Sequence, residues 1–164
     1  MLNKLALLFT LLLSNLLFIP VSHAVDASEK IEQILADKNA PVGIVFEIVT
    51  GGANSLEWAL PEVQNHIKEL RARFPKLEIA IVTHGSEQFA LQTSKSKKFK
   101  KVHSLTQQLV KDDNVPLHVC GTHASWRNVT EEDFPEYVDV AAAGPATIND
   151  YLSLGYILIV IEDT

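Results

Sequence analysis

Apolar and polar residues alternate along the chain in blocks that predict strands and helices in turn. Short apolar runs rich in β-branched residues predict five strands, at 42–49, 77–83, 115–120, 138–142 and 156–161. Helical spacing or helix-start residues predict helices around them, at 26–38, 60–74, 87–92, 104–111, 124–126, 130–134 and 144–155. This alternation favours a three-layer α/β/α sandwich with a five-stranded parallel sheet. The last strand is apolar on both faces, so we expect it to be central or well covered.

The longest predicted helix contains a proline. Its apolar positions recur at steps of three or four residues from Leu56 to Phe74, which is typical of one buried stripe. Pro61 allows two interpretations: the helix begins near Leu60 with the proline in its first turn, or a longer helix is kinked there. Because proline is tolerated in a first turn, we expect the first arrangement.

The N-terminus has the layout of a secretory signal peptide. Lys4 precedes an apolar run of 15 residues from Leu5 to Ile19, and small residues stand at Ser22 and Ala24. The alternative is an uncleaved membrane anchor, but spanning a bilayer takes about 20 apolar residues. We therefore predict a signal peptide at 1–24 and a single domain at 25–164 that is periplasmic or secreted.

The charge of the chain limits its partners. Its formal net charge is −6, and Lys4 is the only charged residue of the predicted signal peptide. An acidic domain does not suit nucleic acid or anionic lipid, so we expect no nucleic-acid partner and no membrane contact after cleavage. The lysine-rich segment 94–101 is the exception. We interpret it as a solvated loop or helix flank, with a docking patch for an acidic partner or anion as the alternative. No Walker-type loop or G-x-G-x-x-G pattern is present, and we expect no cofactor.

Cys120 is the only cysteine of the chain, so no intrachain disulfide is possible. It ends the predicted strand 115–120 and stands directly before Gly121-Thr122-His123. The thiol is either a small buried hydrophobe or a reactive group. If a helix begins just after it, the helix dipole and a nearby cationic histidine favour the reactive thiolate.

Several candidate binding residues stand at the ends of other strands. In a parallel α/β sheet, ligands bind outside the carboxyl ends of the strands, so these residues are expected to meet at one edge. Glycines there let backbone N–H groups approach a ligand closely. The candidates are Thr50, Gly51, Asn54, His84, Cys120, Gly121, His123 and Gly144.

Short motifs in the right order resemble the DsrE/DsrF-like sulfur-relay family. The run 115–120 is similar to the family's strand that carries the sulfur-accepting cysteine, and 82–85 resembles its second-strand ending. An alanine-rich strand, Gly144 and the segment 152–156 also fit, so the resemblance covers roughly 42–162. It implies a three-layer fold, assembly into a trimer or hexamer, and persulfide sulfur carried on Cys120. The export signal departs from the best understood cytoplasmic relays, so we expect the partner to be an exported sulfur donor or acceptor protein or a small sulfur compound.

Two other functions remain open. His118, Cys120 and His123 offer imidazole and thiolate ligands for zinc or copper, provided that the turn at Gly121 is tight. Alternatively, Cys120 only packs, and the chain is a non-catalytic ligand-binding or assembly module. Glu47 lies inside the first predicted strand, where a buried carboxylate needs a partner such as an arginine or a backbone N–H.

Overall fold

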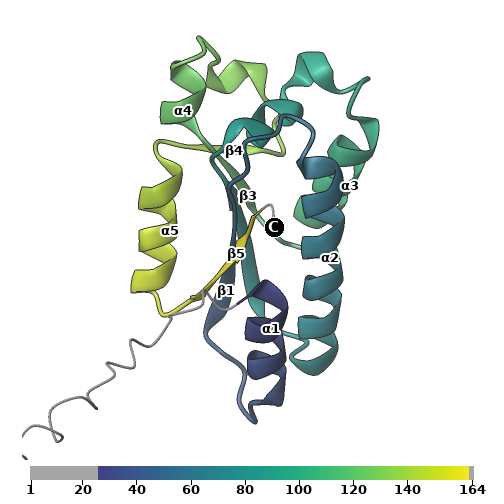
Figure 1. Cartoon of the computed structure of the whole chain (residues 1–164), viewed down its shortest axis with the longest axis vertical. Coiled ribbons are helices and arrows are strands. Elements are labelled where there is room, and N and C mark those ends of the chain that lie inside the picture. The colour runs from purple at the N-terminus through teal and green to yellow at the C-terminus, as the bar shows by residue number, and fades with distance from the viewer. Residues whose placement is uncertain (1–25, 163–164) are drawn as a thin grey trace, which may run out of the picture.

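Five parallel strands form one sheet at the centre of the protein (Figure 1). The computed structural model describes residues 26–162. The strands are β1 (Gly43–Ile48), β2 (Glu78–Thr83), β3 (Leu117–Cys120), β4 (Asp139–Ala141) and β5 (Ile157–Ile161), in the spatial order β4-β3-β2-β1-β5. The α-helices are α1 (Ala27–Ala36), α2 (Leu56–Arg73), α3 (Lys100–Lys111), α4 (Gly121–Ser125) and α5 (Gly144–Ser153). Three 3₁₀ helices lie between them: η1 (Ser86–Leu91), η2 (Thr93–Lys95) and η3 (Glu131–Asp133).

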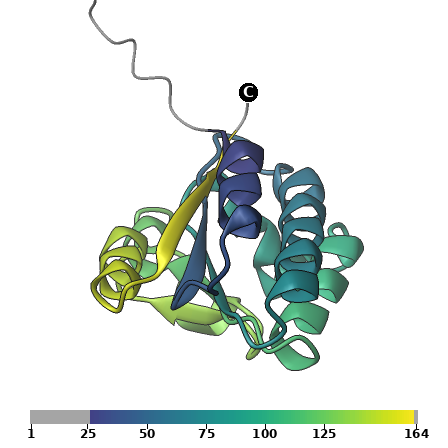
Figure 2. The ribbon, with the colours of Figure 1, turned by 90° about the horizontal axis from the view of Figure 1, so that it is seen from below.

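Helices cover both faces of the sheet unequally (Figure 2). Helices α1, α2 and α3 pack on one face, where alternate residues of β1, Ile44, Phe46 and Ile48, join the large core. Helix α5 packs on the other face, where Val45 joins a smaller cluster with Ile148. Successive strand residues point to opposite faces, so the two-sided burial of β1 requires both layers. The predicted α/β/α sandwich with a five-stranded parallel sheet is confirmed.

The expectation for Pro61 is wrong. Helix α2 begins at Leu56 and continues through the proline, which is exposed. Leu56 and Leu60, which precede the proline, and Val63, which follows it, are fully buried, so hydrophobic burial holds the first turns in helical form. The helix lacks the bond that residue 61 would donate to the carbonyl of Glu57, but Glu57 is exposed and water can replace that donor.

The last strand is not central. Strand β5 pairs with β1 only and forms one edge of the sheet. Ile159 and Ile161 are buried toward the α1 side, while Leu158 packs with the cluster beneath α5. Cover from two helical layers, and not a central position, explains why the strand is apolar on both faces.

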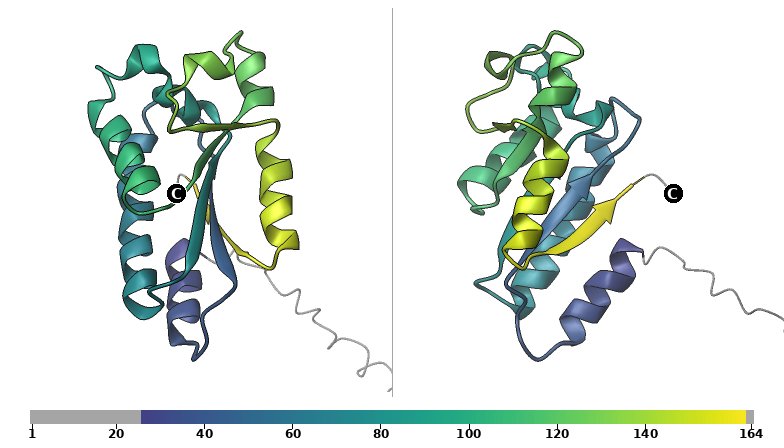
Figure 3. Two further views of the ribbon diagram at one scale, coloured as in Figure 1. Left: turned by 180° about the vertical axis from the view of Figure 1, so that it is seen from behind. Right: turned by 90° about the vertical axis from the view of Figure 1, so that its left-hand side faces the viewer.

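Several elements also differ from the predictions in extent or type. Helix α4 begins at Gly121 and not at 124. Helix α3 begins at Lys100, so the last two lysines of the segment 94–101 form its first turn. The predicted helix at 87–92 is the 3₁₀ helix η1. Figure 3 shows that the chain between β2 and α3 lies at the same end of the sheet as α4. That end is the carboxyl edge of β2 and β3, where the candidate residues were expected.

The predicted signal peptide at 1–24 lies outside the described residues. Within residues 26–162, no helix has the length and apolarity needed to cross a membrane.

Candidate functional site

Cys120 stands where β3 passes into α4. It is the last residue of the strand and the N-cap of the short helix, and its Sγ accepts a hydrogen bond from the backbone N–H of His123 at 3.4 Å. Its exposed fraction is 5%. An N–H donor aimed at sulfur favours negative charge there, which is the form that acts as nucleophile.

Gln88 holds the backbone of Cys120. Its Oε1 accepts the N–H of Cys120 at 2.7 Å, and its Nε2 donates to the carbonyl of Cys120 at 3.4 Å. The Gln88 side chain is fully buried in η1 and replaces the neighbour that a strand would otherwise provide. The sequence analysis missed this residue. Gln88 stands between Glu87 and the short apolar run 89–91, and no periodic pattern distinguishes it.

His84 and Gly144 pack beside the cysteine. The position that a Cβ atom would take on Gly144 lies 2.7 Å from His84 Cβ and 3.4 Å from Cys120 Cβ. Any larger residue at 144 would press on both side chains. Glycine is therefore needed at the start of α5 for the helix to approach β2 and β3 this closely.

The partner of Glu47 is His84. His84 Nε2 lies 2.6 Å from Glu47 Oε1, and both side chains are largely buried, with 17% and 18% exposed. The sequence analysis expected an arginine or a backbone N–H in this role. A histidine serves because β1 and β2 are neighbours, which brings residues 37 positions apart in the chain together. The carboxylate fixes the direction of the imidazole ring beside the cysteine.

The ring of His123 is held by contacts with other residues than the cysteine. Its Nδ1 lies 2.8 Å from the carbonyl oxygen of His84, and the ring contacts Phe89 edge-on and Trp126 at a tilt. His123 thus contributes its backbone N–H, and not its imidazole, to Cys120. The structure brings together Cys120, His84, His123 and Gly144.

Gly121 also belongs to this group. A Cβ atom on it would come within 3.0 Å of the carbonyl oxygen of Ala141, so the glycine lets α4 start tightly against β4. Thr122 fastens the same junction, because its N–H and its hydroxyl both donate to the carbonyl of Ala142.

Thr50, Gly51 and Asn54 lie past the end of β1, which is separated by β2 from the strand that carries Cys120. The backbone N–H and the hydroxyl of Thr50 both donate to Glu87 Oε2, at 2.9 and 3.0 Å. Its amide is therefore occupied inside the protein. Gly51 and Asn54 are exposed, and a Cβ atom on Gly51 would meet open space. These three residues are adjacent to the site through Glu87 and do not touch its sulfur.

Glu87 joins the ends of β1 and β2. It is fully buried, and its second oxygen accepts the hydroxyl of Thr83 at 2.5 Å and the N–H of Gly85 at 2.8 Å. With the two bonds from Thr50, its carboxylate accepts four hydrogen bonds, as a buried acidic group requires. The sequence analysis did not single out this residue.

His118 is engaged on both sides of its ring. Nδ1 lies 2.5 Å from Asp139 Oδ2 and Nε2 lies 2.9 Å from the hydroxyl of Tyr151. Burial, and then the charges of Asp139 and Glu78, hold the pKa of Tyr151 above its usual range.

Among residues 26–162, no three His, Cys, Asp or Glu side chains are placed to bind one metal ion, so His118, Cys120 and His123 are not assembled as ligands.

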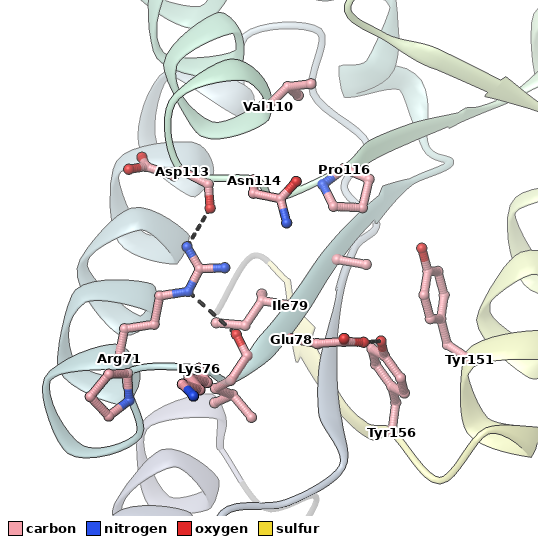
Figure 4. A pocket seen from close by; sticks show the side chains of 13 residues that line it. Arg71, Lys76, Glu78, Ile79, Val110, Asp113, Asn114, Pro116, Tyr151 and Tyr156 are labelled. Carbon is pink, nitrogen blue, oxygen red and sulfur yellow. Dashed lines mark hydrogen bonds between the residues drawn. The ribbon is translucent and has the colours of Figure 1, made fainter.

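A shallow cavity of about 650 Å³ lies at the opposite end of the sheet (Figure 4). Arg71 points into it from α2, donating to the carbonyls of Leu77 and Asp113, and Tyr151 and Tyr156 line its other side. The hydroxyl of Tyr156 donates to Glu78 at 2.6 Å. This cavity is at the amino ends of the strands and is separate from the cysteine.

One known protein family matches most of the described chain. The DsrE/DsrF-like family model matches residues 61–161, from within α2 to the end of β5. The chain belongs to the DsrE/DsrF-like family. This DsrE-like chain has no match among curated proteins.

Solved structures agree with the fold. A protein of unknown function from Methanobacterium thermoautotrophicum superposes with a TM-score of 0.56 at 20% identity, covering 72% of this chain and 97% of that one. The YchN protein of E. coli gives a TM-score of 0.52 at 14% identity, covering 74% of this chain and 99% of its own. At these identities the two structures support the DsrE-like fold alone.

Proposed function

We propose that this protein is an exported sulfane-sulfur carrier that holds sulfur on Cys120 as a persulfide. The observation that carries the proposal is the hydrogen bond from the His123 backbone N–H to Cys120 Sγ at the start of α4. Membership of the DsrE/DsrF-like family, which suggests a role in sulfur relay, and the presence of one cysteine support the same reading.

The transfer needs no external oxidant. The Cys120 thiolate attacks the outer sulfur of a donor persulfide, a new S–S bond forms, and the donor leaves as its thiolate. An acceptor thiolate then attacks the outer sulfur of the Cys120 persulfide and regenerates the Cys120 thiolate. Each step exchanges one S–S bond for another, so the oxidation states balance. The role of the protein is to present the sulfur and to stabilise its negative charge.

The residues around the sulfur would divide this work. The backbone N–H of His123 stabilises charge on Sγ, and Gln88 holds the Cys120 backbone so that Sγ keeps its direction. His84, oriented by Glu47, places an imidazole beside the same edge and can supply or accept a proton as thiols exchange.

Intact-mass measurement tests the proposal. The mature chain, residues 25–164, is incubated with inorganic polysulfide, and the expected result is the addition of sulfur atoms that dithiothreitol removes. Cys120→Ser is the control and should gain nothing, since it removes the only thiol. A wild-type thiol that gains no sulfur and resists alkylation in the folded state would overturn the proposal and leave Cys120 as a packing residue, as its 5% exposure allows.

We also propose that the mature protein is periplasmic or secreted and works as a homo-oligomer, a trimer or hexamer, with a donor or acceptor that is exported as well. The sequence of residues 1–24 supports the export. Mass spectrometry of the protein from cell fractions tests it, and a chain that still begins at Met1 in the cytosolic fraction would contradict it. Light scattering of the purified mature chain tests the oligomer, which a monomeric mass would exclude.

A further inference from the structure

Two cationic side chains from separate segments, Lys95 and Arg127, meet on the ring of Phe89. A third, Lys98, follows Lys95 closely in the chain, and its ammonium lies 4.7 Å from the centre of the Phe99 ring. Lys95 and Lys98 follow η1, and Arg127 follows α4. The guanidinium of Arg127 lies 4.6 Å and the ammonium of Lys95 lies 5.9 Å from the centre of the Phe89 ring, so one buried ring carries both cations. Figure 1 shows the two segments at the same end of the sheet.

These charges are not neutralised within the described part of the chain. Every ion pair among residues 26–162 with N···O within 4.0 Å involves a histidine, and none involves Lys95, Lys98 or Arg127. Among the described residues, the guanidinium of Arg127 donates only to the neutral hydroxyl of Ser86, at 3.1 Å. Partial burial, and then the charges of Lys98 and Arg127, hold the pKa of Lys95 below its usual value. The positive charges repel one another, and a bound anionic group would offset this repulsion.

The cationic cluster is defined as Lys95, Lys98 and Arg127. A chain of contacts through Phe89 and His123 connects Lys95 and Arg127 to the sulfur. The Phe89 ring contacts the ring of His123 with centroids 5.2 Å apart, and the backbone of His123 donates to Cys120 Sγ. The ring of His123 also contacts Trp126, whose ring centroid is 5.5 Å away and whose exposed fraction is 75%. An exposed tryptophan beside arginine is typical of the centre of a protein interface.

We infer that the cationic cluster and Trp126 form the docking surface for an acidic protein segment that exchanges sulfur with Cys120. The inference rests on the proposed function, because it names the partner of the same site. The chain as a whole has a net charge of −6, so a second acidic protein is repelled everywhere except at such a patch. The exposed Lys97, Lys100 and Lys101 extend the patch and suit an extended acidic surface better than a single small anion.

The test compares two peptides that differ in charge alone. Each carries one cysteine activated as a thiopyridyl disulfide, flanked by glutamates in the first peptide and by glutamines in the second. The Cys120 thiolate attacks the peptide sulfur, forms a mixed disulfide and releases pyridinethione, whose absorbance gives the rate. We expect wild type to react about 10-fold faster with the acidic peptide at low salt, and the preference to fall as salt is added.

Two triple variants separate the cluster from overall charge. Replacement of Lys95, Lys98 and Arg127 by glutamine should equalise the two rates by slowing the acidic peptide alone. The matched control replaces Lys38, Lys68 and Lys76, which are exposed and lie away from the carboxyl edge, and it should keep the preference. An unchanged preference in the first variant, or its loss in the control, overturns the docking surface.

A binding measurement keeps the two hypotheses distinguishable. The acidic peptide with serine in place of cysteine carries a fluorescent label, and its anisotropy is followed with the wild type and both triple variants. If Cys120 reacts with neither activated peptide but the labelled peptide binds through the cluster, the carrier function fails and the docking surface stands. If Cys120 reacts equally with both peptides and the labelled peptide does not bind, the docking surface fails and the reactive thiol stands.

Discussion

Replacement of Glu87 by glutamine tests how the carboxyl edge of the sheet is held together. The change keeps the size of the side chain and exchanges one carboxylate oxygen for an NH₂ group. In the structure, Oε2 accepts the backbone N–H of Thr50 and Oε1 accepts the backbone N–H of Gly85. Each oxygen also accepts a threonine hydroxyl, from Thr50 or Thr83.

Neither orientation of the glutamine satisfies both backbone donors. The hydroxyl groups can rotate and accept from the NH₂ group, but a backbone N–H cannot. Glutamine therefore always leaves one N–H, of Thr50 or of Gly85, facing another donor in a buried site. An unsatisfied buried donor costs about 1–3 kcal/mol, and the lost charge on the remaining bonds adds to it. We expect Glu87→Gln to lower the free energy of unfolding by about 2–3 kcal/mol.

Urea unfolding followed by circular dichroism measures this loss. A fall in the midpoint with an unchanged slope is expected, with a Tm lower by roughly 4–10 °C. Glu32→Gln, on the exposed side of α1, is the matched control and should stay within about 0.5 kcal/mol of the wild type. If Glu87→Gln also stays within that margin, the four hydrogen bonds do not hold this edge and the reasoning is wrong. Because Gln88 holds Cys120, the same variant should also make the thiol easier to alkylate.

Two further predictions use other contacts. Gly144→Ala places a methyl group 2.7 Å from His84 Cβ. We therefore expect the free energy of unfolding in urea to fall by about 1–3 kcal/mol and the reactivity of Cys120 to change. Wild-type behaviour in both measurements would show that α5 is not packed as described. The hydrogen bond to Glu78, and then burial, raise the pKa of Tyr156 from 10.0 to about 12. This contribution to stability is fully present below pH 10 and is lost as the pH rises through about 12, so wild type should lose more stability than Tyr156→Phe over that range; parallel pH profiles of the two proteins would contradict the assignment.

The sequence predicted most of the residues at the carboxyl edge, but not Glu87 and Gln88, which hold that edge by hydrogen bonds. Cys120, His84 and Gly144 each follow a strand that the apolar pattern identifies, and parallel strands bring such ends together. Glu87 and Gln88 stand in a 3₁₀ helix with no periodic pattern to mark them, and each has a partner more than 30 residues away, Thr50 for Glu87 and Cys120 for Gln88. The helix start predicted from Pro61 was wrong because the preference of proline for a first turn is weaker than the burial of Leu56 and Leu60.

The sequence by itself determined the order of strands and helices and the residues at each strand end. The spacing of apolar residues and the length of each apolar run are local properties of the chain. The sequence also determined that one thiol is available, at Cys120. Only the tertiary structure decided which strands are neighbours, and with that the pairing of Glu47 with His84 and the edge position of β5. The same holds for Arg127 and Lys95, which meet on Phe89 from segments that no local pattern connects. Such contacts follow from the paths of the loops between elements, which depend on packing across the whole domain.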